Sequence, residues 1–145
     1  MKLYIDIGSK MGYALVGNSG KVTSGTVNFY ASEGQGKGMR YLKFWTWLHT
    51  MPEVTDVKYE VVLAHRGVYA AHVYGAFEGI LQMWCEAGKR SYEGIGVGTI
   101  KKAATGYGKA TKEQMIAAAE AAGYSPGDDN EADALAIMIN FGGRK

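Results

Sequence analysis

The N-terminal segment alternates between hydrophobic and polar positions, a pattern that predicts β-strands. Residues 2–8 carry an apolar side chain at every second position, so one face of this strand is apolar. Two further apolar segments, residues 12–17 and 21–29, are separated by the turn sequence Asn-Ser-Gly. We therefore expect the chain to open with a three-stranded antiparallel meander.

The hydrophobic period then changes from that of a strand to that of a helix. A polar, glycine-rich connector at residues 31–38 leads into residues 39–51, where apolar residues recur at helical spacing until Pro52. Residues 68–88 form a longer apolar segment, which is predicted to be a helix with Gly88 as its C-cap.

Between these two helices, residues 57–67 (VKYEVVLAHRG) are typical of a strand rich in β-branched residues. Glu60 lies in this strand beside Tyr59 and a run of apolar residues. A carboxylate in such surroundings is partly desolvated, which costs free energy unless a partner compensates for it. The partner of Glu60 is therefore the first question about function.

The last part of the chain predicts one short strand and three helices. The strand lies around residues 91–98. The helices are expected at residues 100–106, 112–123 and 131–142, with Thr99 and Thr111 as the N-caps of the first two.

The element order is therefore β-β-β-α-β-α-β-α-α-α, which predicts a single α/β domain over residues 1–145. Strands joined through helical segments favour a mixed sheet with helices on its faces. In such sheets functional groups gather at the carboxyl ends of the central parallel strands.

Composition narrows the class of protein. The chain has 145 residues, of which 47% are hydrophobic and 21% charged, as expected for a globular domain with a real core. Its net charge of +2 does not by itself require a nucleic-acid partner, although a local basic face would suffice. Cys85 is the single cysteine, which excludes an internal disulfide and a cysteine zinc cluster; we expect it to be a buried small hydrophobe.

No segment approaches the roughly 18 apolar residues of a membrane span, and the N-terminal segment is predicted to be a strand rather than a signal peptide. We therefore expect a cytoplasmic protein with no membrane partner.

Acidic residues fall at comparable places in three predicted elements. Asp6 ends the first strand, Glu60 lies in the next parallel strand, and Asp133 begins the last helix, where Asp129 and Asn130 share its side. Carboxylates brought together repel one another, and Mg²⁺ removes that penalty because it prefers oxygen ligands. Two such ions support phosphodiester hydrolysis. The pattern thus predicts a metal ion shared by Asp6, Glu60 and Asp133.

Each acidic residue also has a simpler interpretation. Asp6 could cap a turn, and Glu60 could pair with Lys58 or Arg66. Asn130 could be a helix N-cap, with Asp133 as its capping-box partner.

Four motifs in order give the chain a resemblance to the RuvC Holliday-junction resolvases. They are IDIGSKMGYALV at residues 5–16, Glu60 in an apolar strand, GTIKKAATGYGKATKEQM at 98–115 and NEADALAIMI at 130–139. The resemblance runs essentially from end to end and implies a ribonuclease H-like fold. Its sheet would be mixed and five-stranded, with three antiparallel strands followed by parallel strands, flanked by helices.

The resemblance implies a homodimeric endonuclease, dependent on two Mg²⁺ ions or on Mn²⁺, that nicks four-way DNA junctions symmetrically. It places Asp6, Glu60 and Asp133 on three metal ligands and Asn130 on the fourth, where the family usually has Asp or His. Either Asn130 is a weaker ligand, or Asp129 or Glu131 takes its place. The compact chain fits a phage-type member, acting in the cytoplasm of a bacterial or phage-infected cell.

The resemblance also places basic residues beside the site. Lys101 and the catalytic candidate Lys112 match residues that contact phosphate or steady the charge of the transition state. Leu63 occupies the place of an aromatic wedge, so Tyr69, His65 or Leu63 itself could separate the strands. The predicted DNA contacts are Lys10, Arg40, Arg66, Lys101, Lys102, Tyr107, Lys109 and Lys112.

Residues 68–87 are apolar nearly all round, so one face should pack on the sheet and a second face should meet a two-fold partner. The resembled family uses a helix at this place for its dimer contact. The alternative is a helix fully buried within one chain.

Three other functions compete with junction resolution. Actin-like and sugar-kinase ATPases also begin with a strand and Asp-x-Gly, but they need two such domains, which 145 residues do not supply. A non-catalytic junction-binding protein would bind DNA without turnover. Other ribonuclease H-like nucleases act on a wider range of branched DNA or on RNA hybrids with the same acidic set.

Overall fold

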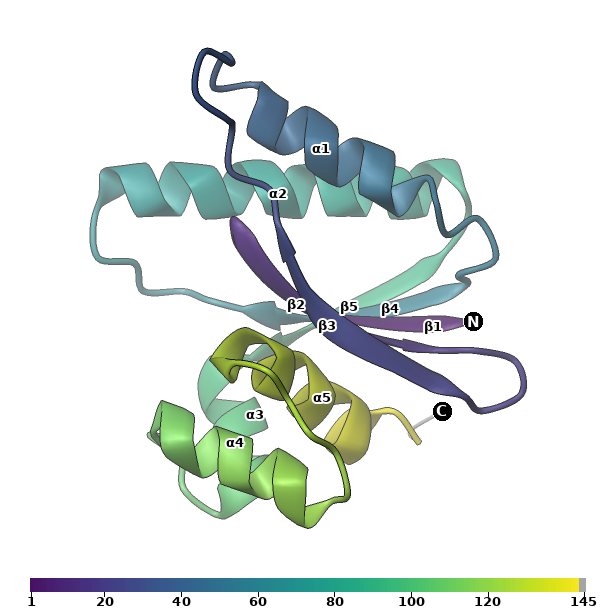
Figure 1. Ribbon diagram of the computed structural model, residues 1–145, viewed down its shortest axis with the longest axis vertical. Coiled ribbons are helices and arrows are strands. Elements are labelled where there is room, and N and C mark those ends of the chain that lie inside the picture. The colour runs from purple at the N-terminus through teal and green to yellow at the C-terminus, as the bar shows by residue number, and fades with distance from the viewer. Residues whose placement is uncertain (144–145) are drawn as a thin grey trace.

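The structure, a computed structural model, describes residues 1–143, which form a mixed five-stranded sheet with strand order β3-β2-β1-β4-β5 (Figure 1). The first three strands are antiparallel neighbours, whereas β1–β4 and β4–β5 are parallel pairs. This confirms the predicted sheet. The strands are β1 (Lys2–Asp6), β2 (Lys10–Val16), β3 (Val22–Asn28), β4 (Asp56–Val61) and β5 (Ser91–Gly96).

Five helices within the described residues cover the two faces of this sheet (Figure 1). One face carries α1 (Met39–Leu48) and α2 (Val68–Ala87), and the other carries α3 (Val97–Thr105), α4 (Lys112–Ala121) and α5 (Asp129–Phe141). None of these helices is long and apolar enough to cross a membrane.

Strand alternation divides the core into two layers. Leu3 and Ile5 of β1 pack with Phe44 and Phe77 on the α1–α2 side. Tyr4, between them in sequence, packs on the other side with the small and aliphatic residues of α5. The same alternation directs Asp6 toward α5.

Several predicted boundaries move in the structure. Strand β4 ends at Val61, and Leu63 beyond it is 91% exposed. Helix α3 begins at Val97, so the prediction of Thr99 as an N-cap was wrong. Helix α5 begins at Asp129 with Asp128 as its N-cap, so Asn130 does not have that role.

Thr111 is the N-cap of α4, as predicted. Its hydroxyl accepts a hydrogen bond from the Gln114 amide, and the Gln114 side chain accepts one from the Thr111 amide. This reciprocal pair is a capping box. Gly88 follows α2 as its C-cap, and Cys85 is fully buried, both as expected.

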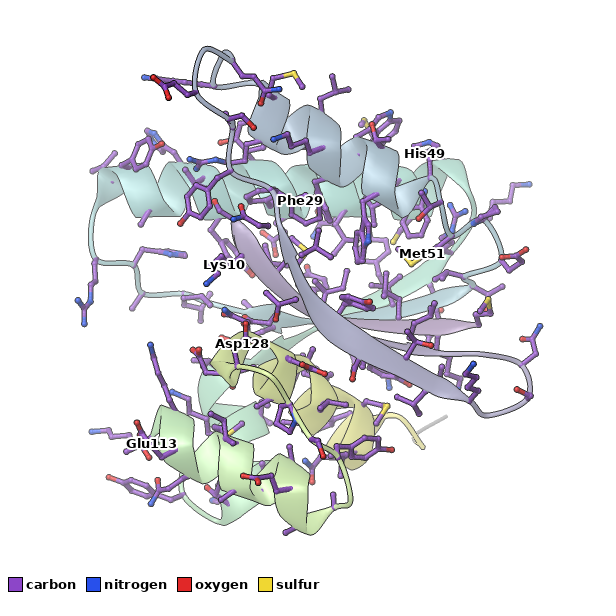
Figure 2. The ribbon with its side chains drawn as sticks, in the orientation of Figure 1. Lys10, Phe29, His49, Met51, Glu113 and Asp128 are labelled. Carbon is purple, nitrogen blue, oxygen red and sulfur yellow. The ribbon has the colours of Figure 1, made fainter. Side chains whose placement is uncertain are left out.

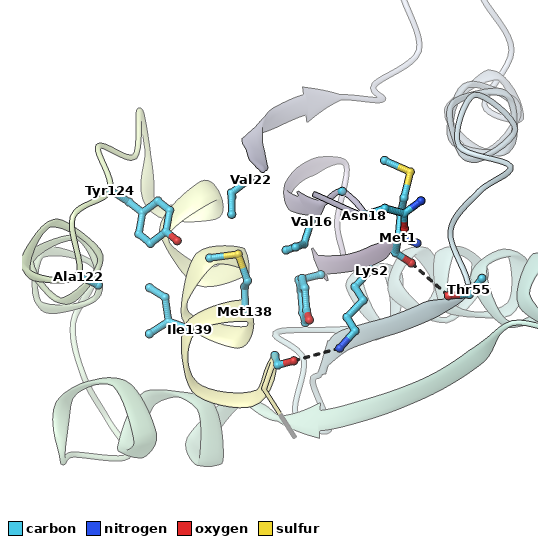
Figure 3. A pocket seen from close by; sticks show the side chains of 13 residues that line it. Met1, Lys2, Val16, Asn18, Val22, Thr55, Ala122, Tyr124, Met138 and Ile139 are labelled. Carbon is cyan, nitrogen blue, oxygen red and sulfur yellow. Dashed lines mark hydrogen bonds between the residues drawn. The ribbon is translucent and has the colours of Figure 1, made fainter. Parts of the chain in front are cut away.

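Two lysines lie at the C-terminal end of α5. Lys58 Nζ donates to the Phe141 carbonyl at 3.0 Å, and Lys2 Nζ donates to the Gly142 carbonyl at 3.4 Å (Figure 3). Positive charge at this end complements the helix dipole. The Lys58 ammonium therefore binds the C-terminal end of α5, and the alternative that it pairs with Glu60 was wrong.

A cavity of about 730 Å³ lies at this same end of the molecule (Figure 3). Lys2, Tyr124 and Met138 are among the residues that line it. The acidic residues lie at the opposite ends of β1 and α5, so this cavity is separate from them.

Candidate active site

Asp6 and Glu60 are neighbours because of the register of two parallel strands. β1 pairs with β4 so that Ile5 lies opposite Tyr59, and the next residue of each strand is acidic. Alternation points both of these carboxylates toward the face that α5 covers. Glu60 is 8% exposed and Asp6 is partly buried.

Helix α5 brings the third carboxylate to this pair. Its N-terminal turn lies against β2 at Gly12, where a methyl group would collide with the Asn130 carbonyl. Glycine at this position therefore permits the close approach of helix and strand. One carboxylate oxygen each from Asp6, Glu60 and Asp133 lie within 4.8 Å of one another.

The three clustered carboxylates make the ionised state of the site unfavourable. Burial, followed by the charges of Glu60 and Asp133, raises the pKa of Asp6 well above its usual value. Burial and the charge of Asp133 raise the pKa of Glu60 to about 7. Burial and the charge of Asp129 raise the pKa of Asp133 to about 6.

No hydrogen bond from the described part of the chain compensates for this burial at Asp6, Glu60 or Asp133. Desolvated carboxylates without donors are costly. A divalent cation would compensate for this cost, because two oxygens sharing one Mg²⁺ lie at most about 4 Å apart. The three residues therefore fit a metal ion after a small adjustment.

Neighbouring acidic residues of α5 have other partners. Glu131 accepts hydrogen bonds from the Ser24 hydroxyl at 2.7 Å and from the Gly127 amide at 2.8 Å. Asp128 accepts from the Thr26 hydroxyl at 2.7 Å and from the Glu131 amide at 2.9 Å. Glu131 thus ties the helix to β3 and does not face the carboxylate group.

Asp129 and Asn130 lie beside the three-carboxylate group without belonging to it. The Asp129 carboxylate forms an ion pair with Lys112 Nζ at 3.7 Å, and its charge raises the pKa of Asp133 and of Asp6. The Asn130 carbonyl packs against Gly12. Between the two side chains, Asp129 is the one whose charge acts on the site.

Two of the predicted basic residues lie close enough to influence the carboxylates. The charge of Lys101, in α3, lowers the pKa of both Glu60 and Asp133 against the raising effect of burial. Lys112, the first residue of α4, lowers the pKa of Asp133 in the same way and is 76% exposed. Both lysines therefore face the site from the α3–α4 layer.

Lys10 lies at the end of the sheet where α5 begins, beside Asp128 (Figure 2). Lys102, Lys109 and Tyr107 are exposed on and after α3.

The remaining predicted contacts lie on the α1–α2 side. Arg66 is exposed in the loop after β4, and the Arg40 guanidinium lies over the Tyr30 ring, 5.2 Å from its centroid. Arg40 lines a hollow of about 340 Å³ with Gly8, Ser9, His65 and Tyr69. This hollow adjoins the carboxyl end of β1, because Ile7, Gly8 and Ser9 are among the residues that line it.

Sequence reasoning missed Tyr74, Ser24 and Thr26. Tyr74 donates a hydrogen bond to the Glu60 carbonyl at 2.7 Å, and the two β3 hydroxyls hold Glu131 and Asp128. These contacts join residues that are 14, 107 and 102 positions apart in sequence, and the residue pattern carries no signal for them beyond strand alternation and helical spacing.

No protein-family model and no curated protein sequence matches the chain. Solved structures match it over nearly its whole length. A structure of Thermus thermophilus RuvC gives a TM-score of 0.72 at 20% identity, covering 97% of this chain and 92% of that one. T. thermophilus RuvC in complex with Holliday junction substrate gives 0.73 at 21% identity, with the same coverage.

The yeast mitochondrial Holliday junction resolvase Ydc2 gives a TM-score of 0.65 at 14% identity, covering 97% of this chain and 76% of that one. The strand order, the helical layers and these superpositions agree with one another. The chain has the ribonuclease H-like fold of the RuvC Holliday-junction resolvases.

Proposed function

We propose that this protein is a metal-dependent endonuclease that resolves four-way DNA junctions by symmetric phosphodiester hydrolysis. The observation that carries the proposal is the convergence of Asp6, Glu60 and Asp133 on a fold shared with RuvC. One of the matching structures is described as RuvC in complex with Holliday junction substrate, which supports branched DNA as the substrate.

Asp6, Glu60 and Asp133 would hold the metal, and Asp129 or Asn130 would complete the ligand set for two ions. Mg²⁺ suits these oxygen ligands, and Mn²⁺ would substitute for it. When bound, such ions activate water and neutralise the charge that develops on the scissile phosphate.

The lysines of the α3–α4 layer would position the DNA. Lys112 is exposed and close to Asp129, so it can exchange this surface ion pair for a phosphate contact with little loss. Lys101 would stabilise charge nearer the carboxylates. Lys10, Lys102, Lys109 and Tyr107 would extend the contact along the backbone and onto an exposed base.

A second copy of the chain would cover the outer face of α2. Phe77, Leu81 and Trp84 are buried against the sheet, but Val68 is 71% and Met83 53% exposed, so the helix is not fully buried within one chain. A two-fold contact on this face would place two active sites to cut opposed strands.

The test compares four-way junction, flap, linear duplex and RNA–DNA hybrid, each with Mg²⁺, with Mn²⁺ and with EDTA. We expect paired symmetric nicks in the junction with either metal and none with EDTA. Binding without cleavage under both metals would instead identify a non-catalytic junction-binding protein. Equal cleavage of all branched substrates would identify a broader nuclease.

A further inference from the structure

We propose that Tyr74 is a positioning residue that holds the metal-binding carboxylate of Glu60 through the main chain of β4. The inference rests on the proposed function, because it assigns Glu60 to the metal. Tyr74 itself touches neither the carboxylate cluster nor any reacting atom; it acts through the backbone of the residue that does.

The hydroxyl of Tyr74 contacts two main-chain groups on either side of the end of β4. It donates to the Glu60 carbonyl at 2.7 Å and accepts from the Val62 amide at 3.4 Å. One side chain of α2 thus spans the last residues of the strand and the first residue of the loop. Helix α2 is packed on the sheet through Phe77 and Leu81, so the anchor is rigid.

Glu60 needs such an anchor because the sheet is ending at this point. The pairing with β1 stops at Ile5 and Tyr59, one residue before Glu60. The pairing with β5 stops at Val61 and Gly96, one residue after it. Without the Tyr74 hydroxyl, the backbone of Glu60 would be held from one side only, and it would lead into an exposed loop.

Tyr59 offers a matched comparison at the same interface. It is the residue before Glu60, and its hydroxyl also bonds across to α2, accepting from Gln82 at 3.0 Å and donating to Glu78 at 2.9 Å. These partners are side chains, so losing the Tyr59 hydroxyl leaves the Glu60 carbonyl in place. Loss of the Tyr59 hydroxyl therefore tests the attachment of β4 to α2 in general, whereas loss of the Tyr74 hydroxyl tests the attachment of the Glu60 main chain.

The experiment compares Tyr74→Phe with Tyr59→Phe in the full chain. Mn²⁺ binding without DNA is measured by calorimetry, and junction cleavage is measured as kcat and KM. Loss of a group that orients a metal ligand typically weakens metal affinity by 10- to 100-fold, and we expect the lower limit, about tenfold, in Tyr74→Phe. Its kcat should fall with KM for the junction unchanged, whereas Tyr59→Phe should bind Mn²⁺ like the wild type.

Equal Mn²⁺ affinity in the two variants would overturn the inference while leaving the proposed function intact. Failure of the wild type to bind Mn²⁺ would overturn both.

A measurement on the wild type alone gives a second test by amide hydrogen exchange. The Val62 amide should exchange more slowly than those of Ala64 and Arg66 in the same loop. Equal exchange rates would show that the Tyr74 hydroxyl does not hold the main chain at the end of β4.

Discussion

Two sets of acidic side chains meet at the start of α5, and they differ in their partners. Asp128 and Glu131 each accept a hydrogen bond from a hydroxyl of β3 and another from a backbone amide. Within residues 1–143, the carboxylates of Asp6, Glu60 and Asp133 accept no hydrogen bond and lie close to one another, with Lys101 and Lys112 nearby. We call these the tethered acids and the clustered acids.

The pKa of the tethered acid Asp128 moves in the opposite direction to those of the clustered acids. Burial would raise the pKa of Asp128, but hydrogen bonds from the Glu131 amide and the Thr26 hydroxyl outweigh it and the pKa is lowered. The pKa values of the clustered acids are raised. Asp128 therefore stabilises the fold as an anion, whereas the clustered acids oppose folding as anions in the absence of a compensating cation. The same residue type serves structure or chemistry according to the donors around it.

The largest expected effect comes from Asp6→Asn, which removes a clustered acid without changing its shape. Cleavage of the junction should fall by about a thousandfold or more, because a metal ligand supplies several kcal/mol of transition-state stabilisation. Junction binding should persist, since the phosphate contacts come from other residues. Single-turnover cleavage and a gel-shift assay measure the two effects.

The tethered acid Asp128 provides the matched control, as Asp128→Asn keeps an acceptor oxygen at the helix N-cap. This variant should retain most of the cleavage rate per folded molecule. An unchanged cleavage rate in Asp6→Asn would remove the clustered acids from the chemistry.

The pH dependence of stability gives the next largest effect. The raised pKa of Glu60 means that the folded state holds its proton more tightly than the unfolded state does. Its contribution is fully present below its usual pKa of 4.5 and is lost as pH rises toward about 7. With EDTA, the free energy of unfolding should therefore fall between pH 5 and pH 8, by roughly 3 kcal/mol from Glu60.

Urea denaturation at several pH values measures this loss, and saturating Mg²⁺ should remove most of it. Glu60→Gln should make the EDTA profile shallower, because one of the three titrating carboxylates is gone. A profile in EDTA that is already flat for the wild type would show that burial and neighbouring charge do not raise the pKa values of the clustered acids in the folded state.

The sequence patterns were sufficient to predict the elements that carry the three clustered acids. Alternation in residues 2–8 and the β-branched pattern of residues 57–67 predicted the strands that carry Asp6 and Glu60, and the element order predicted that these strands are parallel. Helical spacing placed Asp133 on the last helix. These features are local, so the sequence encodes them directly.

The division between tethered and clustered acids was not predictable, because it depends on contacts made across the chain. Asp128, Asp129, Asn130 and Glu131 are all suited to a helix start, and the hydroxyls of β3 decide which of them are tethered. The start of α3 was missed for a related reason. Val97 is β-branched and directly follows the strand, so its own propensity favours a continuation of that strand.

A smaller effect on stability is expected when the hydrogen bonds of a tethered acid are removed. Asp128→Ala removes the N-cap acceptor and leaves the Thr26 hydroxyl without its partner, so the free energy of unfolding should decrease by about 1 kcal/mol. Because the pKa of Asp128 is lowered, its contribution is present above its usual pKa and is lost as pH falls through the lowered value. The loss should therefore be constant between pH 6 and pH 8. A loss that grows toward high pH would place Asp128 with the clustered acids.

The smallest effect on stability is expected from Lys112→Ala, which removes the ion pair between Lys112 of α4 and Asp129 of α5. Lys112 is 76% exposed and the pair distance is 3.7 Å, so the free energy of unfolding should change by less than about 1 kcal/mol. Junction binding should respond more clearly, with the slope of log affinity against log salt decreasing by about one. Lys21→Ala, an exposed lysine in the distant β2–β3 turn, should leave that slope unchanged. Equal slopes for wild type and Lys112→Ala would mean that Lys112 does not contact a phosphate and acts only through its charge on the clustered acids.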